Sequence, residues 1–138
     1  MNVIKKKDVN NYVCRECLNK LSKCICDEYP LYLIHMDKDI QEHIKILNKK
    51  NYRTKFCCAS HDKSLYIHIV FSFNYFKNYN ENLPKDFKYD DKKFLLYYDV
   101  KCKNMSIEQI NEKRKLALNE LLDFCKSLEK LNDYKVFL

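Results

Sequence analysis

"SLYIHIVFSF", residues 64–73, alternates apolar side chains with more polar ones at a period of two. Successive side chains of a β-strand point to opposite faces of a sheet, so this pattern predicts a strand with one buried face. The side chains predicted to face the core are Leu65, Ile67, Ile69, Phe71 and Phe73. Those predicted to face outward are Tyr66, His68, Val70 and Ser72.

Three further segments have strand patterns. "LYLIHM", residues 31–36, predicts a short strand, and "YRTKFCC", residues 52–58, predicts one with Tyr52, Thr54, Phe56 and Cys58 on the same side. "KFLLYYDVK", residues 93–101, predicts inward positions at Phe94, Leu96, Tyr98 and Val100. Its outward positions are Leu95, Tyr97, Asp99 and Lys101.

Two segments have the 3.6-residue period of an amphipathic helix. In residues 37–50 the apolar face holds Ile40, Ile44 and Leu47, with Asp37 or Asp39 as the expected N-terminal cap and Asn48 or Asn51 in the left-handed position at the end. Residues 106–131 begin with a capping box of Ser106 and Gln109. The apolar arc of this longer helix is predicted to hold Ile107, Ile110, Ala117, Leu118, Leu121, Leu122, Cys125 and Leu128.

Residues 74–92 have no period and are rich in asparagine and tyrosine, which predicts a long exposed loop. The tail "YKVFL", residues 134–138, has the pattern of a further short strand. The chain contains no glycine, so turns that need a positive φ are expected to use asparagine or aspartate.

The N-terminal segment "CRECLNKLSKCIC", residues 14–26, holds four cysteines. A CxxC pair and a nearby CxC pair can supply four thiolates to one Zn²⁺ in tetrahedral geometry, which leaves no open position for catalysis. The segment therefore predicts a structural zinc knuckle, and a redox CxxC is disfavoured because no strand precedes it. The predicted zinc ligands are Cys14, Cys17, Cys24 and Cys26.

This opening resembles that of small uncharacterised proteins of Firmicutes and their phages, whose pattern is CxxCxxxLSxCxC. The resemblance continues through "DIQEHIKILNKKNYRTKFCCASH", residues 39–61, with Asn51 and Ser60 where the similar proteins have glycine. The two segments cover about a quarter of the chain. The resemblance implies a phage or mobile-element origin and attaches no activity, and a small basic chain of this kind fits an inhibitor of host defence of the anti-CRISPR type.

The order of predicted elements gives the fold class: α+β, a two-layer sandwich of mostly antiparallel sheet with two helices on one face, plus the N-terminal zinc knuckle. The expected domains are the knuckle, 1–29, and the α+β body, 30–138. No secretory signal or membrane span is predicted, and a cytoplasmic location is expected. In that reducing compartment eight cysteines are not expected to form a disulfide framework.

The outward face of the predicted sheet is the first candidate for binding. Tyr66, His68 and Tyr97 can stack on unpaired bases, or they can form the centre of a protein interface. A third interpretation is a half-solvated face partly covered by the long loop. Exposed tyrosines in that loop, at Tyr75, Tyr79 and Tyr89, extend the set of candidate partner-binding residues.

Arg114 and the group around Cys58 are two further candidates for a functional role. Arg114 falls within the apolar arc of the long helix, where it either reaches solvent from the core edge or pairs with a ligand or partner. Cys58 and His61, with His68 nearby, could form a nucleophile and base or half of a second metal site, although packing is the favoured interpretation. The sequence has no glycine-rich phosphate loop, HExxH or GxSxG motif, so an enzyme is not predicted.

Two functions remain open on the sequence. The first is a zinc-binding inhibitor that occludes a host defence complex, which could be a ribonucleoprotein. The second is a nucleic-acid-binding protein that uses the tyrosine-bearing face together with the net charge of +7. A mixed, aromatic-rimmed patch would favour a protein partner, and a continuous basic stripe would favour nucleic acid.

Overall fold

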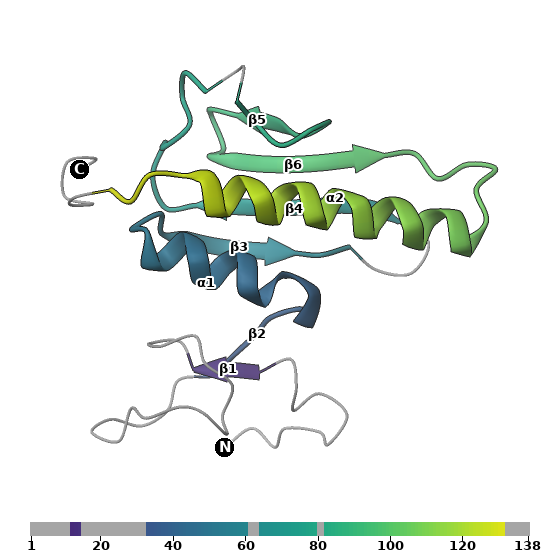
Figure 1. Ribbon diagram of the computed structural model, residues 1–138, viewed down its shortest axis with the longest axis horizontal. Coiled ribbons are helices and arrows are strands. Elements are labelled where there is room, and N and C mark those ends of the chain that lie inside the picture. Colours follow the sequence, from purple (N-terminus) through teal and green to yellow (C-terminus); the bar gives the residue numbers. More distant parts are fainter. Residues whose placement is uncertain (1–11, 15–32, 61–63, 80–81, 132–138) are drawn as a thin grey trace.

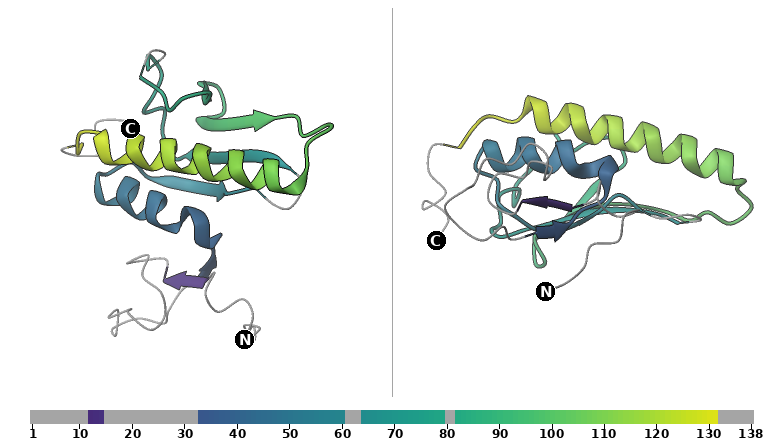
Figure 2. Two further views of the ribbon diagram at one scale, coloured as in Figure 1. Left: turned by 45° about the vertical axis from the view of Figure 1, so that its right-hand side comes forward. Right: turned by 90° about the horizontal axis from the view of Figure 1, so that it is seen from below.

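The computed structural model describes residues 12–14, 33–60, 64–79 and 82–131, with the backbone alone described for 12–14 and 33–35. Its main body is a four-stranded antiparallel sheet with two helices (Figure 1). The strands, in spatial order, are β3 (Thr54–Cys58), β4 (Leu65–Phe71), β6 (Leu95–Val100) and β5 (Lys88–Asp90). The predicted α+β class is confirmed, and both helices lie on one face of the sheet (Figure 2).

The first predicted strand lies outside this sheet. β2 (Leu33–His35) pairs in antiparallel fashion with β1 (Tyr12–Cys14), and the two form a separate two-stranded sheet. The sequence pattern gave no indication of β1, because three residues are too few for a period to be recognised.

The first helical segment begins as a short 3₁₀-helix, η3 (Lys38–Ile40), and continues as α1 (Gln41–Lys49). Ile40, Ile44 and Leu47 are buried, as predicted. Asp37 does not cap the helix with its side chain; its carboxylate instead accepts a 3.0 Å hydrogen bond from the Ala59 backbone N–H. Asn51 takes the predicted left-handed conformation with φ of 71°.

β3 carries a β-bulge that corrects the predicted facing of its side chains. Thr54 pairs with Phe71, but Phe56 pairs with Val70, so one residue is inserted between the two pairs. The insertion turns Phe56 to the outer face, where 68% of its side-chain surface is exposed. Cys57, opposite the buried Ile69, packs against the core.

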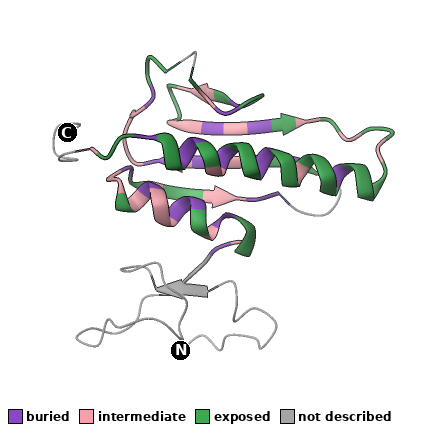
Figure 3. Ribbon diagram, in the orientation of Figure 1, coloured by how far each residue is buried: buried purple, intermediate pink, exposed green. Residues whose placement is uncertain are grey.

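β4 and β6 follow the predicted alternation. Leu65, Ile67, Ile69 and Phe71 are buried on β4, and Leu96 and Tyr98 are buried on β6 (Figure 3). The two strands are the central pair of the sheet, with Ile67 opposite Tyr98 and Ile69 opposite Leu96. Their inward side chains pack beneath the helices, which fixes every intervening side chain on the opposite face.

The prediction of an exposed loop over residues 74–92 is wrong in part. The segment contains β5, and Phe76 and Phe87 are buried in the core. The Phe76 ring lies 5.0 Å from that of Phe71 and 5.7 Å from that of Phe124, between sheet and helix. The loop folds back because its Phe76 and Phe87 side chains are buried in the core.

α2 (Ile107–Ser127) begins with the predicted capping box, in which Ser106 and Gln109 exchange hydrogen bonds. Ile107 was predicted on the apolar arc, yet 56% of it is exposed, because the first turn of α2 extends past the packed face. Phe124 was not predicted in the core and is buried there. After α2 the chain returns to α1, where the Leu131 N–H donates to the Lys50 carbonyl at 2.9 Å.

Candidate functional site

The outer face of the four-stranded sheet, on the side away from α1 and α2, gathers the predicted site residues. In the part of the chain that the structure describes, no helix lies on this face (Figure 2). Strand register places the outward side chains in rows that run across the strands, because paired residues on neighbouring strands share a face. We call these the apolar row, the polar row and the tyrosine–aspartate pair.

The apolar row crosses all four strands. Phe56, Val70 and Leu95 lie side by side on β3, β4 and β6, and Asp90 on β5 ends the row. Phe56 is far more exposed than the other large apolar side chains of the sheet. Its bulged position was missed by sequence reasoning, and no local signal would have found it.

The polar row lies next to the apolar row and holds Cys58, His68, Tyr97 and Lys88. Burial lowers the pKa of His68 below its ordinary value, with Asp37 opposing that shift, so the imidazole is neutral near pH 7. The polar row therefore offers several hydrogen-bonding groups but only one full charge, which is the ammonium group of Lys88 at the edge of the sheet.

The tyrosine–aspartate pair consists of Tyr66 on β4 and Asp99 on β6, which lie directly opposite each other. The Tyr66 ring centroid lies 4.8 Å from that of His68 and 6.4 Å from that of Tyr97. Burial, and then the Asp99 carboxylate, raise the pKa of the Tyr66 phenol, which keeps its hydroxyl protonated at neutral pH. The structure confirms that Tyr66, His68 and Tyr97 share the outer face, and the pairing of β4 with β6 makes them neighbours.

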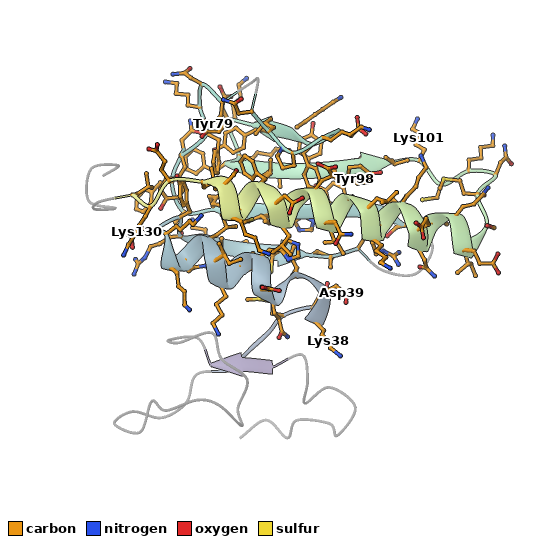
Figure 4. The ribbon with its side chains drawn as sticks, in the orientation of Figure 1. Lys38, Asp39, Tyr79, Tyr98, Lys101 and Lys130 are labelled. Atoms are coloured by element: carbon orange, nitrogen blue, oxygen red, sulfur yellow. The ribbon has the colours of Figure 1, made fainter. Side chains whose placement is uncertain are left out.

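The loop tyrosines do not join this cluster. Tyr75 and Tyr89, predicted to be exposed, are half-buried against the core. The Tyr75 hydroxyl accepts from the Arg53 N–H at 3.1 Å, and the Tyr89 hydroxyl donates to Asn74 Oδ1 at 2.6 Å. Tyr79 is exposed, at the opposite end of the sheet from Lys101 (Figure 4).

Arg114 lies on α2 and is also separate from the outer face. Its guanidinium donates from Nη1 to Asn111 Oδ1 at 2.8 Å and from Nη2 to the Ser64 carbonyl at 3.0 Å. These bonds tie α2 to the residue before β4, and the binding of a partner by Arg114 stays a prediction. It also lines a groove of about 530 Å³ between α1 and α2, together with Asp39, Glu42, His43, Asn111, Lys115, Leu118, Asn119 and Leu122.

The Cys58 thiol lies in a setting that disfavours the thiolate. Burial raises its pKa, and the Asp37 carboxylate, hydrogen-bonded to the thiol, raises it further. The Ser60 N–H lies 3.4 Å from the sulfur and acts in the opposite direction, as does the charge of Arg114. A neutral thiol is a poor nucleophile. His61, the expected partner of Cys58, lies outside the described residues.

The zinc knuckle falls almost wholly outside the described part of the chain. Cys17, Cys24 and Cys26 lie beyond it, and Cys14 is described only as backbone in β1. Within the described ranges, no three His, Cys, Asp or Glu side chains are placed to hold a metal ion. Four thiolates spaced as in residues 14–26 fit Zn²⁺ by their chemistry, and the zinc site stays a prediction.

Comparison of the chain with protein-family models, with curated proteins and with solved structures found no match. Across the described ranges, every helix is too short or too polar to span a lipid bilayer. The function is therefore inferred from the chemistry of the outer face.

Proposed function

We propose that the chain binds another protein through the outer face of its sheet and acts by occluding the surface that it covers. The observation that carries the proposal is the exposure of Phe56, 68% of which is accessible, beside Val70 and Leu95. An exposed apolar row bordered by polar groups is typical of interfaces with proteins. The aromatic side chains Tyr66 and Tyr97 add the residue type that contributes most to such interfaces.

The edges of the sheet are less suited to binding than its face. At the β3 edge the bulge introduces Lys55, and Asp37 already accepts from the Ala59 N–H. The other edge, β5, is only three residues long. Bulges, charged side chains and short strands are the usual means by which proteins prevent strand addition. A partner is therefore expected to contact side chains rather than extend the sheet.

The charge on the outer face favours a protein partner over nucleic acid. Lys88 is accompanied by Asp90 and Asp99, so the rows hold more carboxylates than ammonium groups. Phosphates would be repelled by these carboxylates, and binding to a nucleic-acid backbone needs several cations. On balance, these rows contribute no positive charge to the chain's net charge of +7. The stacking potential of Tyr66 and Tyr97 keeps nucleic-acid binding as the second candidate function.

The size of the face sets an expectation for affinity. The four strands hold 21 residues in all, so at about 3.4 Å per residue and about 4.8 Å between strands the face covers roughly 340 Å². A standard protein interface buries about 800 Å² on each partner. A partner limited to this face would bind weakly, so a tight inhibitor must also contact residues around it.

The partner and the cofactor belong to the same proposal. The resemblance of residues 14–26 and 39–61 to phage-encoded proteins supports a host defence complex as the target, with inhibition of the anti-CRISPR type. Zinc at the four N-terminal cysteines would hold the segment before the sheet in one conformation. The proposed role needs no catalytic group.

Affinity capture from host lysate tests the proposal, with Phe56→Ser and Leu116→Ser as matched variants. Both residues are exposed, at 68% and 56%, but Leu116 lies on α2, away from the outer face. We expect the wild-type chain and Leu116→Ser to capture the same protein, with or without nuclease, and Phe56→Ser to lose it. Equal capture by Phe56→Ser would contradict the proposal. Loss of the captured protein after nuclease treatment would favour nucleic acid as the binding partner.

A further inference from the structure

Four neighbouring side chains of the outer face form a distinct corner, which we call the Tyr66–Asp99 corner. Tyr66 and His68 lie on β4, and Tyr97 and Asp99 lie opposite them on β6. Three of the four positions hold aromatic rings, and the fourth holds a carboxylate. Side chains at directly opposed positions have Cβ atoms about 5 Å apart, so all four groups can contact one bound moiety.

The rings of the corner are tilted against one another, and the Tyr66 ring is the most exposed of the three. The ring planes of Tyr66 and Tyr97 meet at 41° and their centroids lie 6.4 Å apart, so the two rings are tilted and not stacked. The Tyr66 and His68 planes meet at 36°. Tyr66 retains 36% of its exposure, and Asp99 is exposed beside it. Aromatic faces carry negative electrostatic potential, and the carboxylate adds a full negative charge.

The aromatic rings and the Asp99 carboxylate both favour the binding of a cation. Among the described residues, the chain does not supply that cation. No described lysine or arginine forms an ion pair with Asp99 or a ring contact with Tyr66. Lys88 lies opposite Tyr97 on β5, and Lys101 follows Asp99 by two positions along the chain, yet within the described structure neither lysine forms an ion pair with Asp99. The described residues thus give the corner the charge of a cation site without supplying its cation.

We infer that the Tyr66–Asp99 corner binds an arginine side chain of the protein partner. The inference rests on the proposed function and adds the chemistry of the residue that the partner presents. A guanidinium is planar, stacks on aromatic faces and can form two parallel hydrogen bonds with a carboxylate, and it is less strongly hydrated than a lysine ammonium. Phe56 and Val70, in the row next to His68 and Tyr97, would then contact the apolar surroundings of that arginine.

The test uses NMR titration of the full-length chain with acetyl-arginine methylamide. Acetyl-citrulline methylamide, which has a similar shape but no charge, is the control ligand. We expect shifts centred on Tyr66, His68, Tyr97 and Asp99, and an affinity for the arginine probe at least about fivefold higher than for citrulline. Asp99→Asn should lower the arginine affinity by about the same factor. The control variant Asp91→Asn removes one negative charge from the turn between β5 and β6, and it should leave the affinity for the arginine probe unchanged.

A second variant separates loss of binding from loss of folding. Tyr66→Phe keeps the ring and should retain arginine binding, whereas Tyr66→Leu should lose it while the core resonances of Ile67 and Ile69 stay in place. Equal affinity for the two probes would overturn the inference, as would shifts located elsewhere. Binding of a ten-residue thymidine oligonucleotide at the corner, without arginine binding, would also overturn it in favour of base stacking.

Failure of this inference differs from failure of the proposed function. If the arginine probe does not bind but Phe56→Ser still abolishes capture of the partner, the corner is not a cation site and the outer face remains the interface. If the arginine probe binds at the corner while Phe56→Ser captures the partner normally, the proposed interface is wrong and the cation site stands.

Discussion

Lys50 and Leu128 are joined by a 2.7 Å hydrogen bond from the lysine ammonium group to the leucine carbonyl oxygen. The same ammonium donates to the carbonyls of Cys125 at 2.9 Å and Lys126 at 2.6 Å. The last carbonyls of a helix lack partners within the helix and carry the negative end of its dipole. The residue that follows α1 therefore supplies the cation that satisfies the end of α2.

Replacing Lys50 by methionine should destabilise the protein by about 1–2 kcal/mol, because three carbonyls lose a charged donor while the apolar stem is kept. Chemical denaturation in urea measures the change. Lys49→Met is the control, since Lys49 is the exposed neighbouring lysine of α1 and no such bonds are found for it in the described structure. Equal stability of the two variants would show that the Lys50 contacts contribute nothing.

Phe76 and Phe56 form a matched pair for testing the core assignment of the loop. Phe76 is 2% exposed and Phe56 is 68% exposed. Phe76→Ala should cost about 3–5 kcal/mol, whereas Phe56→Ala should change stability by less than about 0.5 kcal/mol. Thermal or urea unfolding distinguishes the two. A small effect of Phe76→Ala would mean that the loop does not complete the core.

Stability should fall as the pH is lowered through the range of histidine titration. Burial lowers the pKa of His43 from its ordinary value of 6.5, and its Nε2–H donates to the Leu118 carbonyl at 2.8 Å. Because the unfolded chain binds the proton more readily, the stabilisation is complete above pH 6.5 and is lost as the pH falls toward the folded-state pKa. The free energy of unfolding measured in urea should therefore be lower at pH 5.5 than at pH 7.5 because of this group. His43→Gln should reduce that difference.

Cys58 should react slowly with iodoacetamide in the folded protein at pH 7.5. Its raised pKa follows from burial and from the Asp37 carboxylate. Asp37→Asn keeps an acceptor for the Ala59 N–H but removes the charge, so labelling of Cys58 should become faster. Mass spectrometry of the labelled peptides measures both rates. Fast labelling of the wild-type chain would revive the interpretation of Cys58 as a nucleophile.

The zinc prediction is tested by native mass spectrometry of reduced protein. We expect one Zn²⁺ per chain, released by the double substitution of Cys14 and Cys17 with serine. Cys102→Ser, at a half-buried thiol of the main body, should keep the metal. The four-stranded sheet should remain folded after zinc is lost, because its core lies in α1, α2 and the sheet. Metal-free protein freshly purified under reducing conditions would refute the knuckle.

Sequence alone predicted those features that a local pattern determines. The alternation in residues 64–73 placed Tyr66 and His68 outward, and the capping box located the start of α2. Positive φ at Asn51, at Asp86 and at Asn104 agrees with the expectation for a chain without glycine, although Ser60 and Phe94 also have positive φ. Asn51 and Ser60, with φ of 71° and 76°, lie at positions that glycine would occupy without strain.

The features that sequence did not predict depend on contacts between distant residues. An apolar pattern through Tyr52, Thr54 and Phe56 fits a regular strand, and only pairing with β4 reveals the bulge. Phe76 enters the core because it contacts rings from β4 and α2, which no periodicity around it could show. The Tyr66–Asp99 corner required the pairing of β4 with β6, since alternation gives a face and not a neighbour.

The order of elements along the chain has a consequence for how the protein is made. β4 can pair with β3 as soon as both are synthesised, but its other edge waits for β6, and the inner face of the sheet waits for α2. A ribosome-bound chain that has not yet reached α2 therefore exposes Ile67, Ile69 and Phe71. Surfaces of this kind are recognised by chaperones and promote aggregation. We expect stalled nascent chains that end before residue 106 to be chaperone-bound. We expect completed chains to fold over milliseconds or longer, as domains that combine helices with distant strand pairings do.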